Sequence, residues 1–227
     1  MTIVISIGGS MINPEGKPDS VFLKNIAKII KSSKERFGLV TGGGSSARAY
    51  ANAARELGAS EYEADEVAVI STRQNAQILI LALEKEGIEV EKKAISDFTE
   101  AKCSKAQVVV MCGTIPGITT DTDSVLLAEA IGAKKVINLS NVDAIYDSDP
   151  RKNPKAKKFD SLSYDELISL AATNDKRAAG TNFVFDMLAC KLIARSKIET
   201  HFVSGKDLNQ IKAAIDGKKH SGTVVRG

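Results

Sequence analysis

Short apolar runs alternate with longer amphipathic stretches from one end of the chain to the other. The runs at 3–7, 37–41, 88–95, 106–112, 135–139, 201–203 and 223–226 predict strands. Helical spacing of apolar residues predicts one helix that begins after Asp19 or Ser20, and others at 47–57, 63–85, 123–131, 163–171, 185–193 and 206–216. This alternation of strand and helix is typical of an α/β fold around a mostly parallel sheet.

The stretch 147–154 interrupts this rhythm. It is rich in turn residues and contains Pro150 and Pro154, so it predicts a surface loop. Neither an internal repeat nor a low-complexity linker divides the chain. We therefore expect one domain, 1–227, in which an N-terminal lobe of about 1–132 and a C-terminal lobe of about 133–227 share a single sheet.

The composition is that of an ordinary globular protein. Hydrophobic residues make up 43% and charged residues 26% of the 227 positions, which removes support for a disordered, collagen-like or coiled-coil chain. The 31 Lys and Arg against 28 Asp and Glu give a net charge of +3, and the cations form no dense stripe. Because binding to a phosphate backbone needs clustered cations, nucleic acid is not an expected partner, whereas small anions are.

The sequence predicts neither membrane insertion nor export. The apolar stretch 78–83 is far shorter than the roughly 20 residues that cross a bilayer. The N-terminus lacks the basic segment, apolar run and cleavage site of a secretory signal. Cys103, Cys112 and Cys190 are odd in number and form no C-x-x-C pair, as expected of thiols in a reducing compartment. We therefore expect a cytoplasmic protein.

Three short polar loops follow predicted strands. They are Gly8-Gly9-Ser10, the run from Gly42 to Arg48, and the segment from Gly113 to Asp121. In an open parallel sheet the carboxyl ends of the strands line the ligand crevice, and glycines there let backbone N–H groups approach an anion. Three such loops indicate a ligand with more than one phosphate group, although each loop taken alone also fits a plain connection between strand and helix.

Two common nucleotide motifs fit the second loop poorly. Gly42-x-Gly44-x-x-Ala47 matches the dinucleotide pattern G-x-G-x-x-G/A, but that pattern needs a strand after its helix, and 63–85 has helical periodicity instead. The P-loop pattern G-x-x-x-x-G-K-S/T is absent. The phosphates of a nucleotide would therefore be held in another way.

In this order the three loops resemble those of the amino acid kinase superfamily, and within it the archaeal-type uridylate (UMP) kinases. The resemblance covers almost the whole chain and continues through Thr72-Arg73 with Asn75-Ala76, Asn141-Val142-Asp143 with Tyr146 and Asp149-Pro150, and Ala179-Gly180-Thr181 with Asp186 and 194–196. It implies a three-layer αβα sandwich around a mostly parallel central sheet. It also implies that the ATP γ-phosphoryl group is transferred to UMP, giving UDP and ADP in de novo pyrimidine nucleotide (CTP) biosynthesis, with Mg²⁺ held through the ATP phosphates rather than by a protein metal site.

The resemblance also implies roles for particular residues. Arg48 and Asp186 match catalytic positions beside the transferred phosphate. The implied ATP contacts, which place ATP on the C-terminal lobe, are Gly9, Ser10, Gly44, Arg48, Ser140, Asn141, Tyr146 and Asp149. The implied UMP contacts, on the N-terminal lobe, are Gly43, Asp65, Thr114, Ile115, Pro116, Gly117, Ile118, Thr119 and Thr120. A turn cap for Asp149 and a helix N-terminal charge for Asp186 stay open as alternatives.

The implied phosphoryl transfer does not depend on acid–base catalysis. A UMP phosphate oxygen is already anionic near neutral pH, so the transfer needs positioning and charge neutralisation rather than a general base. Neither His201 nor His220 is then expected to be catalytic.

The chain departs from the superfamily pattern at two positions. Many superfamily members have Lys two residues before the first glycine, where this chain has Ser6, and Ala144 stands where a Gly is usual. The candidates to replace that missing cation are Lys17, Arg48, Lys176 and Arg177.

Two other functions stay open at this point. A sibling kinase would act on a carboxylate, a carbamate or an isoprenoid phosphate, although Asp65, Arg73 and Thr119-Thr120 favour a nucleoside monophosphate. A non-catalytic protein of the same fold that binds nucleotides or oxyanions would account for Ser6. The expected partners are UMP and ATP, and the resemblance alone implies self-association as a homohexamer.

Overall fold

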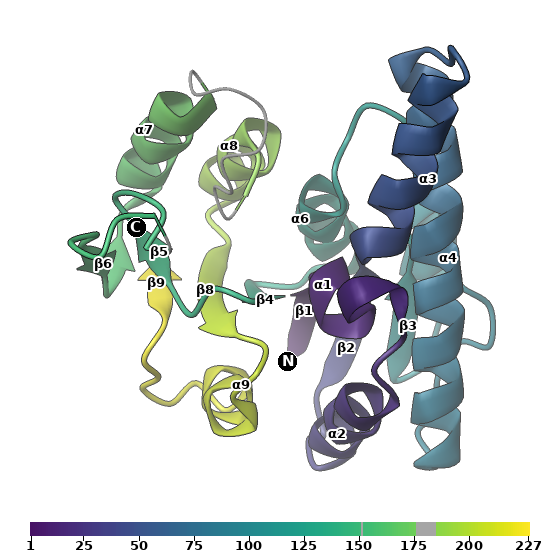
Figure 1. The fold of residues 1–227 in the computed structure, drawn as a ribbon. Helices are drawn as coiled ribbons and strands as arrows, with labels where there is room; N and C mark the ends of the chain where they lie inside the picture. The colour runs from purple at the N-terminus through teal and green to yellow at the C-terminus, as the bar shows by residue number, and fades with distance from the viewer. Residues whose placement is uncertain (151, 176–184) are drawn as a thin grey trace.

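A seven-stranded sheet runs through the protein in the order β3-β2-β1-β4-β8-β9-β7 (Figure 1). The computed structural model describes residues 1–150, 152–175 and 185–227. The strands are β1 (Thr2–Ile7), β2 (Arg36–Thr41), β3 (Val108–Met111), β4 (Lys135–Ser140), β7 (Ser161–Leu162), β8 (Glu199–Ser204) and β9 (Thr223–Val225). The first five strands in this order are parallel, and only β9 runs antiparallel to its neighbour β8. A separate hairpin joins β5 (Ile145–Tyr146) to β6 (Lys158–Phe159).

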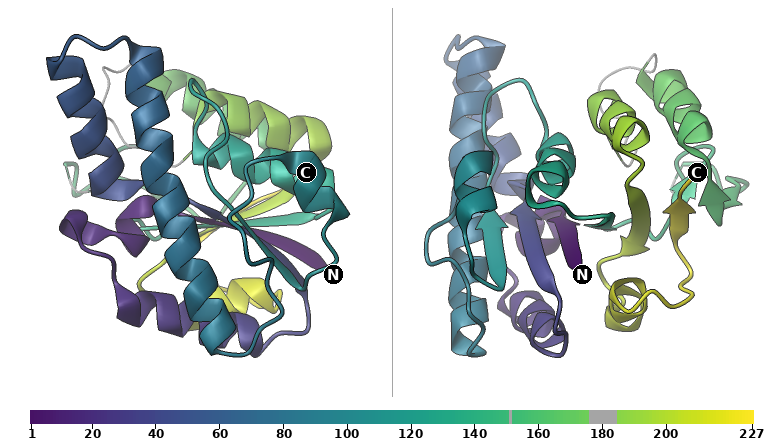
Figure 2. Two further views of the ribbon diagram at one scale, coloured as in Figure 1. Left: turned by 90° about the vertical axis from the view of Figure 1, so that its right-hand side faces the viewer. Right: turned by 180° about the vertical axis from the view of Figure 1, so that it is seen from behind.

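Helices cover both faces of the sheet and make a three-layer sandwich (Figure 2). The helices are α1 (Gly9–Ile12), α2 (Ser20–Lys31), α3 (Gly44–Glu56), α4 (Glu61–Lys85), α5 (Phe98–Cys103), α6 (Thr120–Ile131), α7 (Tyr164–Asp175), α8 (Met187–Ser196) and α9 (Leu208–Ile215), with a 3-10 turn at Pro14–Gly16. Among the described residues, no helix is both long enough and apolar enough to cross a membrane.

The two faces of the sheet belong to two separate hydrophobic cores. Successive side chains of a strand point to opposite faces, so Ile3, Ile5 and Ile7 enter one core while Val4 enters the other. The first core is closed by α2, α4 and α9, and the second by α5, α6, α7 and α8. The predicted αβα sandwich around a mostly parallel sheet is therefore confirmed.

Local signals account for several helix ends. Asp19 accepts hydrogen bonds from the N–H groups of Val21 and Phe22 and starts α2. Ser60 and Glu63 form a reciprocal capping box at the start of α4. Gly132 ends α6 with φ of +70°, a conformation in which glycine lacks the steric penalty of other residues.

The strand predicted at 88–95 is wrong. This segment pairs with β3 at two isolated bridges, Val90 with Val108 and Ile95 with Met111, through backbone hydrogen bonds of Glu89, Glu91 and Ile95. Between the bridges Lys92 and Lys93 are exposed, and the pairing does not continue as a ladder. The sequence prediction also started α3 and α6 about one turn late and missed α5 and the β5–β6 hairpin.

Candidate active site

The loops that follow β1, β2, β3 and β4 meet at one edge of the sheet, because these parallel strands all end there. The first two loops are in backbone contact. A Cβ atom placed on Gly9 would lie 2.0 Å from the nitrogen of Gly44 and 2.7 Å from the carbonyl carbon of Gly42. A side chain at position 9 is therefore excluded, and only backbone lines this contact.

The amino end of α3 points its free N–H groups toward this edge. Its N-cap residue, Gly43, provides no side-chain hydrogen bond. The nearby hydroxyls of Ser45 and Ser46 are turned instead to the loop after α1, where Ser45 donates to the carbonyl of Asn13 at 3.0 Å and Ser46 accepts from its side-chain amide at 2.8 Å. A helix terminus that lacks a cap leaves N–H donors and a positive dipole end for an anion.

Arg48 lies one turn farther along α3. Its side chain is exposed and forms no ion pair with any described residue. Lys17, the second candidate cation, is exposed and follows Gly16, whose N–H donates to Ser45 at 2.7 Å. The other two candidates, Lys176 and Arg177, lie outside the described residues, as do Ala179, Gly180 and Thr181.

Buried polar side chains of α4 tie the second loop to the third. Asn75 donates from its amide nitrogen to the carbonyl oxygen of Gly42 at 2.8 Å. Thr72 accepts from the N–H of Gly113 at 2.8 Å, and its own carbonyl accepts from the Thr41 hydroxyl at 3.0 Å. In the sequence, Thr72 and Asn75 stand out only as part of the family resemblance. Their positions as polar residues on the apolar face of a long helix are the local pattern that could have indicated their role.

Asp65 also belongs to α4 and contacts the third loop. Its carboxylate accepts a hydrogen bond from the N–H of Gly117 at 2.9 Å. A cavity of about 550 Å³ opens beside this contact and is lined by Thr114 and Pro116 together with Glu63, Glu66, Val67, Val69 and Ile70 of α4. Ile115 and Ile118 extend the same loop, and Ile115 is exposed. The structure thus brings Thr114, Pro116 and Gly117 of the predicted UMP segment beside α4.

Asp186 joins the third loop to α8. It caps α8 by accepting from the N–H of Ala189 at 2.9 Å. It also accepts hydrogen bonds from the hydroxyls of Thr119 and Thr122. Thr119 in turn caps α6, with Thr120 as the first residue of that helix. The structure therefore brings Asp186 to the predicted UMP segment, and the helix-cap role considered for it is present as well.

Two further carboxyl groups lie beneath the third loop. Asp121 accepts from the hydroxyl of Ser6 at 3.2 Å, and burial, together with the nearby charge of Asp186, raises the pKa of Asp121 to about 7. Asp123 accepts from the N–H and hydroxyl of Thr114 at 3.3 and 2.6 Å, and burial raises the pKa of Asp123 to about 6. Sequence reasoning did not assign either carboxyl a role. Ser6 faces Asp121 where a superfamily Lys would stand.

The predicted adenosine-side residues lie on the connection that follows β4. Ser140 is next to the first loop, since a Cβ atom placed on Gly8 would lie 3.8 Å from the Cα atom of Ser140. Beyond Ser140 the connection passes the exposed Asn141 and reaches Tyr146, which donates to Asp143 at 3.0 Å. Partial burial and the Asp143 carboxylate raise the pKa of Tyr146 above its ordinary value. The Asp149 carbonyl accepts from the N–H groups of Lys152 and Asn153, which closes a turn.

Comparison with known proteins decides the family. The model of the amino acid kinase family matches residues 1–204. The chain belongs to this family. It is 42% identical to the uridylate kinases of Thermococcus kodakarensis and Archaeoglobus fulgidus, over 99% of this chain and 99% and 100% of theirs. The crystal structure of uridylate kinase from Archaeoglobus fulgidus superposes with a TM-score of 0.87 at 41% identity, covering 99% of this chain and 100% of that one. The resemblance to the archaeal-type uridylate kinases is therefore confirmed for a member of the amino acid kinase family.

Proposed function

We propose that the protein transfers the γ-phosphoryl group of ATP to UMP, giving UDP and ADP in pyrimidine nucleotide (CTP) biosynthesis in the cytoplasm. The observation that carries this proposal is the meeting of three backbone-lined loops at the carboxyl edge of a parallel sheet. Similarity to proteins named uridylate kinase over almost the whole chain supports the choice of acceptor.

The phosphates of ATP fit the contact between the first two loops. Gly9 and Gly44 leave no room for side chains between their backbones, so N–H groups can approach an anion directly. Ser10 follows on α1, and Arg48 on α3 supplies the cation. The adenosine end would then extend past Ser140 and Asn141 toward Tyr146 and Asp149, on the C-terminal lobe of about 133–227.

UMP fits the segment between α3, α4 and the third loop, on the N-terminal lobe of about 1–132. Gly43 begins this surface, and residues 114–120 continue it. Asp65 would accept hydrogen bonds from the ribose, in addition to its contact with Gly117. In this arrangement a UMP phosphate oxygen faces the γ-phosphorus in line with the ADP leaving oxygen, and no proton has to be removed from it.

Charge neutralisation supplies most of the catalysis in this proposal. Arg48 and the α3 N–H groups stabilise charge on the transferred group, and Asp186 positions Thr119 and Thr122 beside it. No cluster of three or more His, Cys, Asp or Glu that could bind a metal exists within the described part of the chain. In this proposal Mg²⁺ is held through the ATP phosphates, where it neutralises their charge.

Self-association belongs to the same proposal. Large apolar side chains are exposed on α3 and α4, namely Tyr50, Tyr62, Ile70 and Leu81, with Leu57 at the end of α3. Exposed apolar surface of this kind is typical of protein interfaces. We propose a homohexamer that uses this surface.

The experiment that tests the function is a coupled ADP-release assay with Mg-ATP and a panel of acceptors. The panel contains UMP, CMP, AMP, acetylglutamate, carbamate and isopentenyl phosphate. Turnover that is fastest with UMP is expected. Turnover with only a carboxylate, a carbamate or isopentenyl phosphate would replace the proposal with a sibling kinase. ATP binding without turnover on any acceptor would indicate a non-catalytic nucleotide-binding protein, and Ser6 would then mark the loss of activity.

A further inference from the structure

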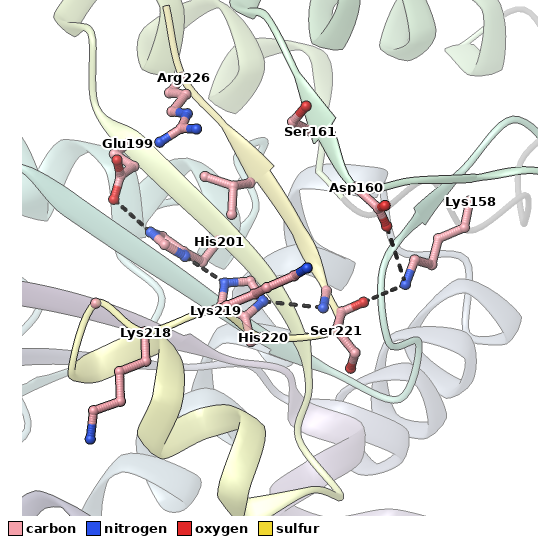
Figure 3. A pocket seen from close by; sticks show the side chains of 13 residues that line it. Lys158, Asp160, Ser161, Glu199, His201, Lys218, Lys219, His220, Ser221 and Arg226 are labelled. Carbon is pink, nitrogen blue, oxygen red and sulfur yellow. Dashed lines mark hydrogen bonds and ion pairs between the residues drawn. The ribbon is translucent and has the colours of Figure 1, made fainter.

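Figure 3 shows the lining of a second cavity, of about 680 Å³. This cavity lies at the other end of the sheet from the glycine loops. It lies between the start of β8, the strands β7 and β9, and the segment 217–222 that joins α9 to β9. The parallel strands β4 and β8 pair from Lys135 with Glu199 to Ser140 with Ser204. Because a strand rises about 3.3 Å per residue, the two ends of β8 are about 16 Å apart, which separates this cavity from the glycine-loop edge.

A row of hydrogen bonds fixes the wall of this cavity. Figure 3 shows Glu199, His201 and His220 joined in sequence. Glu199 Oε1 lies 2.7 Å from His201 Nε2, and His201 Nδ1 lies 2.7 Å from His220 Nε2. Gly222 completes the row, because its N–H donates to His220 Nδ1 at 3.1 Å. The row thereby anchors the segment 217–222 to β8.

Only one arrangement of protons fits this row. An ionised Glu199 accepts, so His201 Nε2–H donates to it and His201 Nδ1 accepts from His220 Nε2–H. His220 Nδ1 is then the acceptor that the Gly222 N–H requires. Both imidazoles are neutral in this arrangement, and burial lowers the pKa of each, that of His220 to about 4. The positive charge of the cavity therefore comes from lysine and arginine.

The cations around the cavity outnumber the carboxylates. Lys158, Lys218, Lys219 and Arg226 line it, against Asp160 and Glu199. Two of these cations have acidic partners, since Lys158 pairs with Asp160 at 3.5 Å and Lys218 with Asp216 at 3.3 Å. Lys219 and Arg226 form no ion pair with any residue that the structure describes. Arg226 is near enough to Glu199 to contribute to the lowered pKa of that carboxylate.

A buried ammonium lies directly behind this wall. Lys135 is only 6% exposed, and its Nζ would lie 3.8 Å from a Cβ on Gly217, which lines the cavity. It donates to the carbonyl oxygen of Ala214, in the last turn of α9, at 3.0 Å, and it lies near enough to its register partner Glu199 to help lower the pKa of that carboxylate. Glu199 and the carboxyl end of α9 stabilise this ammonium, which adds positive charge behind the Gly217 wall of the cavity.

We propose that this cavity binds a small polyanion that carries two or more linked phosphate groups, at a site separate from the glycine loops. Lys219 and Arg226 contact the phosphate oxygens, and Lys135 contributes its charge from behind. The volume is within the range of about 300–1,000 Å³ found for small-ligand sites. The hydrogen-bonded histidine row holds the segment 217–222 in place before the ligand arrives, which lowers the ordering cost of binding.

The two histidines make this proposal directly testable. They are the only ones in the chain, and both line the cavity, so histidine-selective ¹³C labelling reports on this site and not on the glycine loops. Tripolyphosphate is titrated into the full-length protein in its native assembly while the imidazole resonances are followed. We expect a saturable shift of both histidines. A comparison with ATP then distinguishes a nucleotide, if ATP binds more tightly than tripolyphosphate, from free polyphosphate, if it does not.

Charge variants test whether the histidine shift comes from tripolyphosphate bound in this cavity. The double variant Lys219→Ala/Arg226→Ala should weaken tripolyphosphate binding at least about tenfold, because each charged hydrogen bond contributes substantially. The matched control Lys24→Ala/Lys28→Ala removes two exposed lysines of α2 and should bind as the unmodified protein does. Lys135→Met should weaken binding as well, because it removes the positive charge behind Gly217. No saturable histidine shift, or equal weakening in the α2 control, would overturn the proposal.

Discussion

Arg48 lies one turn into α3, exposed, at the edge where the glycine loops meet. If it stabilises charge on the transferred phosphoryl group, Arg48→Ala should lower kcat with UMP by about 10²-fold, the usual effect of removing one such group. Arg48→Lys should recover only part of this loss, because a lysine offers a point charge rather than a bidentate fork. Steady-state kinetics with Mg-ATP and UMP measure both effects.

Arg55 provides the matched control for this prediction. It lies on the same helix but is already paired with Glu61 at 2.7 Å, away from the loops. Arg55→Ala should leave kcat and both KM values unchanged within about twofold, since exposed ion pairs contribute little. Equal losses in Arg48→Ala and Arg55→Ala would mean that α3 is merely destabilised and that Arg48 has no catalytic role.

Asp121 makes stability depend on pH in a defined direction. The unfolded carboxyl titrates near 3.8 and the native one near 7, so the native state holds a proton that the unfolded chain has released between these values. Stability should therefore fall as the pH rises from about 4 to about 7, and the full loss should be present above that range. Asp121→Asn removes this loss and should raise the melting temperature at pH 8 by at least about 2–4 °C. Thermal unfolding of both proteins at pH 5 and pH 8 measures this difference in melting temperature, which should be smaller at pH 5.

Asp160→Asn is the control for the pH effect. Asp160 is almost fully exposed and forms only a 3.5 Å contact with Lys158. Its replacement should change the melting temperature by the same small amount at both pH values. A gain for Asp121→Asn that is as large at pH 5 as at pH 8 would show that titration of Asp121 is not its cause.

Among the elements, α4 positions the site through side chains that face the core. Asn75→Ala would leave the Gly42 carbonyl without its 2.8 Å donor in a buried place. We expect a loss of about 1–3 kcal/mol in the free energy of unfolding, the cost of one unsatisfied buried group. The KM for ATP should also rise, because the second loop loses its anchor. Urea unfolding and steady-state kinetics measure the two effects.

The control for that prediction is Gln77→Ala, an exposed position on the same helix. It should change the free energy of unfolding by no more than about 0.5 kcal/mol and leave KM unchanged. If Asn75→Ala lowers stability but leaves KM as it was, Asn75 stabilises the core without positioning the loop.

The elements also show what the sequence could and could not predict. Buried strands such as β1 and β2 are short apolar runs, and caps such as Ser60 and Gly132 lie where local chemistry requires them. The segment 88–95 has the same local pattern, yet it pairs with the edge strand β3 only at two isolated bridges. The start of α3 was missed because Gly44-Ser45-Ser46 is a poor helix former on its own, and contacts with the Asn13 segment stabilise it.

As with the helices and strands, some candidate site residues could be predicted from local sequence and others could not. The glycines stood out because the chain turns and backbones approach there, and the structure brings those loops together. Pairs distant in sequence, such as Ser6 with Asp121 and Thr122 with Asp186, depend on how the sheet brings the loops together, and no local pattern contains them. The hydrogen-bonded row from Glu199 to His220 could not be predicted from local sequence either, because its members come from β8 and a later loop.

At the scale of the whole molecule, one sheet connects two distinct surfaces. The glycine loops occupy the carboxyl edge, and the basic cavity occupies the start of β8. The strands β4 and β8 extend between them and are paired along their full length. A ligand in the cavity and a nucleotide at the loops can therefore bind at the same time without steric conflict.

The outer face of α4 gives the last prediction. At about 100° per residue, Tyr62, Ile70 and Leu81 lie within an arc of about 100° around α4, on one side of the helix. Tyr62 and Leu81 are 61% and 49% exposed, and burying such side chains between subunits stabilises an assembly. Tyr62→Lys/Leu81→Lys should dissociate the proposed hexamer, whereas Val21→Lys, at an exposed apolar position on α2, should not. Sedimentation velocity distinguishes the two variants, and an intact hexamer in the α4 variant would rule out this face as the contact.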